Sequence, residues 1–182
     1  MTTVNEKTKT SRMVRVAMVT AVICILGPLS IPIPISPVPI SLTQLGIYLA
    51  IYALDKKGAT LATLLYLLIG AVGLPVFSGF GGGIGKLAGP TGGYLIGFVF
   101  LAVIGSLAVD RYPDSRLKTA VGFVLGNLVI YLFGSVWLSV VAGVSFLQAL
   151  AVGVVPYILF DVAKMLLALG IGPKIRQLAK RY

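Results

Sequence analysis

The sequence predicts an all-α, polytopic integral membrane protein, and three observations carry this prediction. Of its 182 residues, 58% are hydrophobic and only 11% are charged, whereas soluble domains carry about 25% charged residues. The mean hydropathy is +1.02, and the apolar residues fall in runs close to the ~20 residues that cross a bilayer. Short basic patches separate these runs, as is typical of membrane topology. Lipid is therefore the expected solvent of this chain.

The apolar runs divide residues 1–182, read as one transmembrane substrate-binding domain, into six spans after a polar tail at 1–12. We expect the spans at about 13–30, 41–54, 59–74, 92–109, 119–138 and 147–170. Four prolines in residues 31–39 exclude a helix and favour an extended loop. The apolar stretch 119–170 is too long for one span at ~1.5 Å per residue, so we divide it near 139–145.

The basic residues support an even number of spans. Of the 15 basic residues, all except Lys86 and Lys164 lie in the terminal segments or after the second and fourth spans. Basic residues concentrate on the cytoplasmic side of membrane proteins. We therefore expect a multi-pass protein of the cell membrane with both termini in the cytoplasm.

Composition also excludes several functions. There is no histidine, and the one cysteine, Cys24, lies in an apolar run, so neither metal sites nor a disulfide framework are expected. The net charge of +10 lies in topological patches without interleaved aromatic residues, so no nucleic-acid partner is expected. No nucleophile accompanies a base, so we expect no enzyme and no cofactor. No ATPase motif or chain of carboxylates is present, so energy for transport must come from another subunit.

A glycine-rich stretch at 75–93 resembles phosphate-binding loops but fits none of them. A Walker A motif requires glycine at position 80 and serine or threonine at 87, whereas this chain has Phe80 and Leu87. The glycines are expected to let backbone pass close to a ligand or a helix. Phe77, Phe80 and Ile84 are costly to leave in water, so part of this loop is expected to fold inward.

Asp161 and Lys164 are the clearest anomaly, because both lie in the last apolar run. A charge near the membrane centre costs roughly 2.5–3.5 kcal/mol and usually marks function. Their i, i+3 spacing places them on one helical face. They either contact a ligand or form a purely structural ion pair. Asn127, an isolated amide in the fifth span, either joins helices or contacts the ligand.

Pairs of small residues four positions apart allow helices to approach closely. Ala17 and Ala21 form such a pair in the first span. Similar glycine pairs occur in the fourth and fifth spans, at positions 93 and 97 and at positions 122 and 126. Internal packing and docking of a partner helix both explain this spacing.

Three blocks of the sequence resemble the BioY family, the biotin-specific S components of energy-coupling-factor (ECF) transporters. They are PVPISLTQLG at 37–46, GAVGLPVFSG at 70–79 with GPTGGY at 89–94, and DVAK at 161–164. The resemblance implies the six-helix S-component fold and biotin as the transported ligand, bound near the external side. It also implies two kinds of partner, a transmembrane scaffold (T) subunit and two ATPase (A) subunits, docked through Ala17 and Ala21.

The resemblance also indicates the ligand-binding residues. Asp161 can accept from the ureido N–H groups of biotin, and Lys164 can donate to a carbonyl or carboxylate. Phe77 and Tyr94 can supply apolar walls. Many relatives have glutamine before threonine in the first block, whereas this chain has the reverse order, so both positions remain candidates. The expected set is Asp161, Lys164, Tyr94, Thr43, Gln44, Phe77, Ser78 and Asn127.

Three other functions remain compatible with the sequence. An S component for another small vitamin would share this architecture. A membrane assembly protein would bind no small molecule. A self-sufficient secondary transporter would show inverted repeats, and no convincing repeat is present in the sequence.

Overall fold

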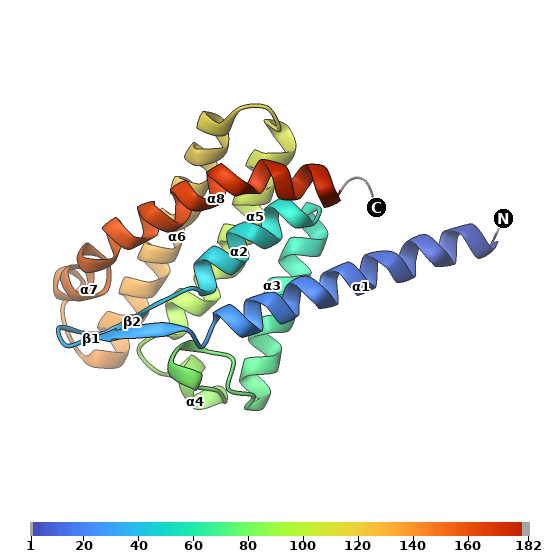
Figure 1. The fold of residues 1–182 in the computed structure, drawn as a ribbon. Coiled ribbons are helices and arrows are strands. Elements are labelled where there is room, and N and C mark those ends of the chain that lie inside the picture. The colour runs from blue at the N-terminus through green and yellow to red at the C-terminus, as the bar shows by residue number, and fades with distance from the viewer. Residues whose placement is uncertain (1, 180–182) are drawn as a thin grey trace.

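The computed structural model describes residues 2–179, which form a bundle of helices with one small β-hairpin (Figure 1). The long helices are α1 (Thr2–Leu26), α2 (Thr43–Ala53), α3 (Lys56–Val72), α5 (Gly92–Arg111), α6 (Arg116–Ala142) and α8 (Ile158–Ala179). The shorter elements are β1 (Ser30–Ile33), β2 (Ser36–Ser41), η1 (Ser78–Phe80), α4 (Ile84–Ala88), α7 (Phe146–Gly153) and η2 (Val155–Tyr157). The predicted helical fold class is thereby confirmed.

The proline-rich segment forms a β-hairpin rather than an unpaired loop. Ser30 pairs with Ser41 and Ile31 with Ile40 in antiparallel register. Both strands are edge strands, so a proline can sit where its missing N–H would point away from the partner strand. The hairpin joins α1 to α2 and lies across one end of the bundle (Figure 1).

Helix α2 lies at the centre of the bundle and packs against α1, α3, α5 and α8. Eight of its 11 residues are buried, including Ile47, Tyr48 and Ile51. Because its apolar side chains are needed on every side, it shows no clear amphipathic pattern. This central position lets α2 carry polar side chains that are shielded from lipid.

Helices α5 and α6 pack closely through the predicted small-residue pairs. A side chain at Gly97 would collide with Ile130, and one at Gly126 would collide with Leu101. These glycines therefore serve internal packing, as the close-approach spacing predicts. Helix α6 ends at Ala142, and Gly143 caps it with φ of 66°, a left-handed conformation that favours glycine.

The predicted sixth span at 147–170 covers more than one element of the structure. Residues 146–153 form the separate helix α7, and α8 begins only at Ile158. Pro156 lies between them in η2, where its missing N–H and its effect on the preceding residue interrupt an α-helix. Helix α8 then runs to Ala179, well beyond the predicted end.

Within residues 2–179, three segments are long and apolar enough to cross a membrane, namely Gly92–Arg111, Arg116–Ala142 and Phe146–Ala179. Large apolar side chains such as Leu68, Leu132 and Leu166 are at least half exposed on the outer surface, as lipid contact requires. Helix α2, with 11 residues, is shorter than a full span, and α3, with 17 residues, is at the lower limit of a span of about 17–25 residues. The membrane class is thus supported, whereas the count of six spans stays a prediction.

The two ends of the bundle differ in chemistry. Both described chain ends lie at one end, away from the hairpin, α4 and α7 (Figure 1). There Arg12 pairs with Asp55 and Arg176 with Asp110. We call this the basic end, and the end that carries the hairpin the pocket end.

Candidate functional site

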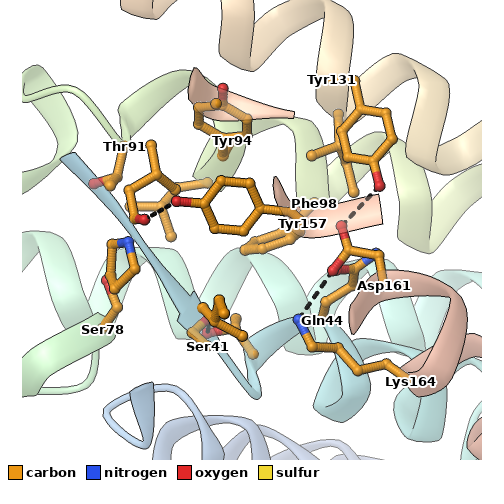
Figure 2. Close-up of a pocket in the computed structure, with 17 residues that line it drawn as sticks. Ser41, Gln44, Ser78, Thr91, Tyr94, Phe98, Tyr131, Tyr157, Asp161 and Lys164 are labelled. Atoms are coloured by element: carbon orange, nitrogen blue, oxygen red, sulfur yellow. Dashed lines mark hydrogen bonds and ion pairs between the residues drawn. The ribbon is translucent and has the colours of Figure 1, made fainter. Parts of the chain in front are cut away.

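A pocket lies inside the pocket end, beneath the hairpin and between α2, α5, α6 and α8 (Figure 2). Its free volume is about 60 Å³. Its lining combines apolar walls with a few polar groups, as is typical of small-molecule sites. The lining residues are Val38, Pro39, Ile40, Ser41, Thr43, Gln44, Ser78, Thr91, Tyr94, Leu95, Phe98, Ile130, Tyr131, Gly153, Tyr157, Asp161 and Lys164.

Asp161 is the charged centre of this pocket. Its carboxylate accepts from the Tyr131 hydroxyl at 2.8 Å and from the Lys164 Nζ at 3.0 Å. The side chains of Asp161 and Lys164 are 9% and 10% exposed. A buried carboxylate is stable only when paired and hydrogen-bonded. Its oxygens have spare lone pairs, so Asp161 can also accept from a ligand N–H.

Gln44 presents an amide to the same pocket from the first turn of α2. Its Nε2 donates to Asn127 Oδ1 at 2.7 Å and to the Tyr48 hydroxyl at 3.1 Å. The Tyr48 hydroxyl donates to the same Asn127 oxygen at 2.9 Å. With both amide hydrogens used, the carbonyl of Gln44 is left to accept from a ligand donor.

Tyr94 enters the pocket from α5 because glycines leave room for its ring. A side chain at Gly134 would overlap the ring, and one at Gly153 would meet the hydroxyl. The Tyr94 hydroxyl and Thr91 Oγ1 are buried and have no hydrogen-bond partner among the described residues. Unsatisfied buried polar atoms are uncommon. A polar ligand between Tyr94 and Thr91 would supply the hydrogen bonds that these two hydroxyl groups lack.

Six of the eight predicted ligand residues line the pocket. They are Thr43, Gln44, Ser78, Tyr94, Asp161 and Lys164. Both candidates in the first block face the site, because Thr43 and Gln44 occupy the first turn of α2 just after the hairpin.

Two predicted residues lie elsewhere. Phe77 is fully buried in the core, with its ring against Gly70 and edge-on to Tyr66. It turned inward as expected but does not reach the pocket wall. Asn127 lies behind Gln44, because its oxygen binds Gln44 and Tyr48, so its contact with the pocket is indirect.

Sequence reasoning missed Tyr131, Tyr157, Thr91 and Ser41. Tyr157 precedes Asp161 by four residues, and Tyr131 follows Asn127 by four. Residues at i and i+4 share a helical face, so this spacing could have indicated both tyrosines. Thr91 immediately precedes α5, and nothing in the sequence indicates that its hydroxyl reaches the site.

The hairpin covers one side of the pocket in this structure. The Tyr157 hydroxyl donates to the backbone carbonyl of Val38 in β2 (Figure 2). The remaining volume of about 60 Å³ is below the 300–1,000 Å³ of typical ligand pockets. A drug-sized molecule can enter only if the hairpin or the side chains beneath it move.

Ala17 and Ala21 lie on the outer surface, away from the pocket. Both are exposed and line a shallow apolar groove with Thr20, Cys24, Leu65, Ile69, Leu74 and Val76. Among the described residues they face this groove, whereas the glycine pairs of α5 and α6 are buried between helices.

Fold and pocket together define a small helical protein of the membrane class with a pocket that combines charged, polar and apolar groups. The model of the BioY family matches residues 1–181. The chain belongs to this family.

Named relatives cover most of the chain. A biotin transporter BioY of Thermotoga maritima is 39% identical over 148 residues, or 81% of this chain and 86% of that protein. A biotin transporter BioY of Rhizobium etli is 37% identical and covers 90% and 91%. The crystal structure of the S component for biotin from an ECF-type ABC transporter superposes with a TM-score of 0.87. That structure is 29% identical and covers 94% of this chain and 93% of its own.

Proposed function

We propose that this chain is the biotin-binding, substrate-capture subunit of an ECF-type ABC transporter for biotin uptake, and that it performs no catalysis. One observation carries the proposal: a buried, hydrogen-bonded carboxylate, Asp161, faces a pocket that is otherwise mostly apolar. The names of the relatives and the S-component structure support biotin as the ligand.

The pocket matches the chemistry of biotin. The ureido ring has two N–H donors, which the carboxylate of Asp161 and the carbonyl of Gln44 can accept. Lys164 can donate to the ureido carbonyl or to the carboxylate at the other end of the molecule. Leu95, Phe98 and Ile130 supply apolar surface for the thioether ring and the valeryl chain.

Titration of the purified chain with biotin in detergent tests this proposal. We expect calorimetric binding near one biotin per chain at micromolar protein, and weaker binding by Asp161→Asn. Asp110→Asn is the matched control, because it makes the same change at the basic end. Heat with another vitamin instead of biotin would favour a different S component. No heat with any vitamin would favour an assembly protein.

We further propose six spans, formed by α1, α2, α3, α5, α6 and α8, with both termini in the cytoplasm. The clustering of basic residues and of both described ends at the basic end supports this orientation. In a Cys24→Ala background, single cysteines at Ser11 and Gln177 should resist an impermeant thiol reagent applied from outside. A cysteine at Ile35, which is 67% exposed in the hairpin, should react. Unlike reactivity of Ser11→Cys and Gln177→Cys would reject an even span count.

Docking of a scaffold (T) subunit with two ATPase (A) subunits is proposed at Ala17 and Ala21. The outward position of both residues in an apolar groove supports it, because small residues permit close helix approach. Ala21→Trp should abolish co-purification with the energising subunits while biotin binding persists. Leu132→Trp, at another exposed apolar position, should leave assembly intact. Equal assembly by both variants would place the docking face elsewhere.

A further inference from the structure

A second cavity opens at the basic end, between α1 and α8. Helix α2 packs between these two helices but ends at Ala53, whereas its neighbours continue past it (Figure 1). The early end of α2 leaves a cleft of about 490 Å³. Its lining is Arg12, Arg15, Tyr52, Ala53, Leu54, Asp55, Asp110, Arg176 and Ala179.

The charges around this cleft do not balance. Arg12 pairs with Asp55 and Arg176 pairs with Asp110, each at 2.9 Å. Arg15 has no carboxylate partner among the described residues and donates only to the backbone carbonyl of Ala179, at 3.3 Å. Among the described residues, three guanidinium groups thus face two carboxylates, so Arg15 has no carboxylate partner there.

Arg15 also retains unused donors. A guanidinium group has five N–H donors, and the structure describes a partner for one nitrogen, Nη1. Its Nε is buried without an acceptor among the described residues, as is the Nε of Arg176. Buried donors without partners are uncommon and point to an additional bound group. An anion with several acceptor oxygens would fit an arginine fork.

Exposed apolar side chains lie on α1 and α8 near the cleft. Val14 and Met18 on α1 are 51% and 64% exposed, and Leu178 on α8 is 57% exposed. Met18 lies on the same face of α1 as Arg15, and Val14 and Leu178 are the chain neighbours of Arg15 and Ala179. A molecule with a phosphate in the cleft could therefore lay acyl chains along these side chains. This combination of acceptor oxygens and hydrocarbon is a phospholipid.

We infer that the cleft around Arg15 binds the phosphodiester of an anionic phospholipid from the leaflet at the basic end. A phosphatidylglycerol headgroup carries one negative charge and no compensating cation, which matches the one arginine of the cleft that has no carboxylate partner among the described residues. Phosphatidylcholine brings its own cation and fits the charge count less well. Arg15 is the residue that distinguishes the two lipids.

Native mass spectrometry of protein taken from mixed phosphatidylglycerol and phosphatidylcholine nanodiscs tests this inference. The wild type should retain phosphatidylglycerol over phosphatidylcholine by about five- to tenfold, the worth of one basic residue near an anionic surface. Arg15→Gln should reduce the preference to less than about twofold, and Arg15→Lys should restore part of it. Lys118→Gln is the matched control, because it removes one exposed basic charge outside the cleft.

Each alternative has its own outcome. Unchanged lipid preference in a folded Arg15→Gln, judged by its melting temperature, would overturn the inference. Displacement of the lipid by excess inorganic phosphate would reject a phospholipid as the ligand and indicate that the cleft binds free phosphate. Unchanged lipid retention with lost co-purification of the energising subunits would instead assign the cleft to an acidic protein segment.

Discussion

Two ion pairs of almost equal length occupy opposite ends of this molecule. Lys164 and Asp161 lie 3.0 Å apart at the pocket end, with side chains 10% and 9% exposed. Arg12 and Asp55 lie 2.9 Å apart at the basic end, with side chains 49% and 57% exposed. The two pairs therefore have nearly the same N–O distance and differ mainly in how deeply their side chains are buried. The comparison shows why the Asp161–Lys164 pair is a candidate for binding biotin and the Arg12–Asp55 pair is not.

Burial changes what each pair costs and what it can do. Removing two charges from water costs several kcal/mol per ion, which mutual attraction repays only with good geometry and further hydrogen bonds. Asp161 has such a further bond from Tyr131. An exposed pair is solvated on both sides and contributes about 0–1 kcal/mol. A ligand can form hydrogen bonds with a buried pair in a pocket because little water is bound there. At an exposed pair, the ligand would have to compete with water for the same hydrogen bonds.

The largest expected effect follows from removing one member of the buried pair. Lys164→Met leaves Asp161 as an unpaired charge in the bundle, which typically costs 3–5 kcal/mol of stability. Asp161→Asn removes an ionised acceptor, and such bonds are worth roughly 1.5–3 kcal/mol, so biotin affinity should fall roughly ten- to a hundredfold. Melting temperature and biotin affinity should be measured on the same variants.

The double variant distinguishes a ligand-binding pair from a purely structural one. Asp161→Asn with Lys164→Met should cost less stability than the sum of the singles, because contacting charges compensate each other. If both residues hold the ligand, the double variant stays folded and still binds biotin poorly. Normal affinity in folded single variants would remove both residues from the site.

A smaller loss of biotin affinity is expected from a change at Asn127, which contacts the pocket residue Gln44 from behind. Asn127→Leu removes the acceptor that holds the Gln44 amide at 2.7 Å, so the carbonyl of Gln44 is no longer fixed toward the ligand. One hydrogen bond is worth about 1 kcal/mol, so biotin affinity should fall about fivefold. Tyr48→Phe is the matched control, because it removes a hydroxyl from the same cluster and leaves the bond between Asn127 and Gln44. A larger loss in Tyr48→Phe than in Asn127→Leu would contradict this order.

The class of fold and the charged centre of the site could be predicted because both depend on short stretches of sequence and not on contacts between distant segments. Apolar runs and basic patches record the bilayer directly, and a charge in an apolar run is conspicuous without knowledge of its neighbours. Asp161 and Lys164 are visible in this way. The end of α6 at Gly143 could also be predicted from nearby residues, because glycine and serines interrupt the apolar run there.

The rest of the site depends on contacts between distant segments. Phe77 and Tyr94 are both aromatic residues near glycines, yet Phe77 packs on Gly70 in the core and Tyr94 packs on Gly134 at the pocket. Nothing in the local sequence separates the two. Asn127 reaches Gln44 across 83 positions, and only the packing of α6 on α2 decides that it supports the site from behind.

The smallest expected effect belongs to the exposed pair, and it completes the comparison of the two ends. Arg12→Gln should cost about 0.2–1 kcal/mol of stability, because water and salt screen the lost attraction.

Asp55 has a second role, since its carboxylate accepts from the backbone N–H of Gly58 at the start of α3. Asparagine caps a helix as well as aspartate does, so Asp55→Asn should match Arg12→Gln. Asp55→Ala also loses the cap and should cost about 0.5–2 kcal/mol more. Melting temperatures at low and high salt would separate these terms, because only the ion-pair term should weaken with salt. If Arg12→Gln destabilised the protein as much as Lys164→Met does, burial would not be the variable that distinguishes the two pairs.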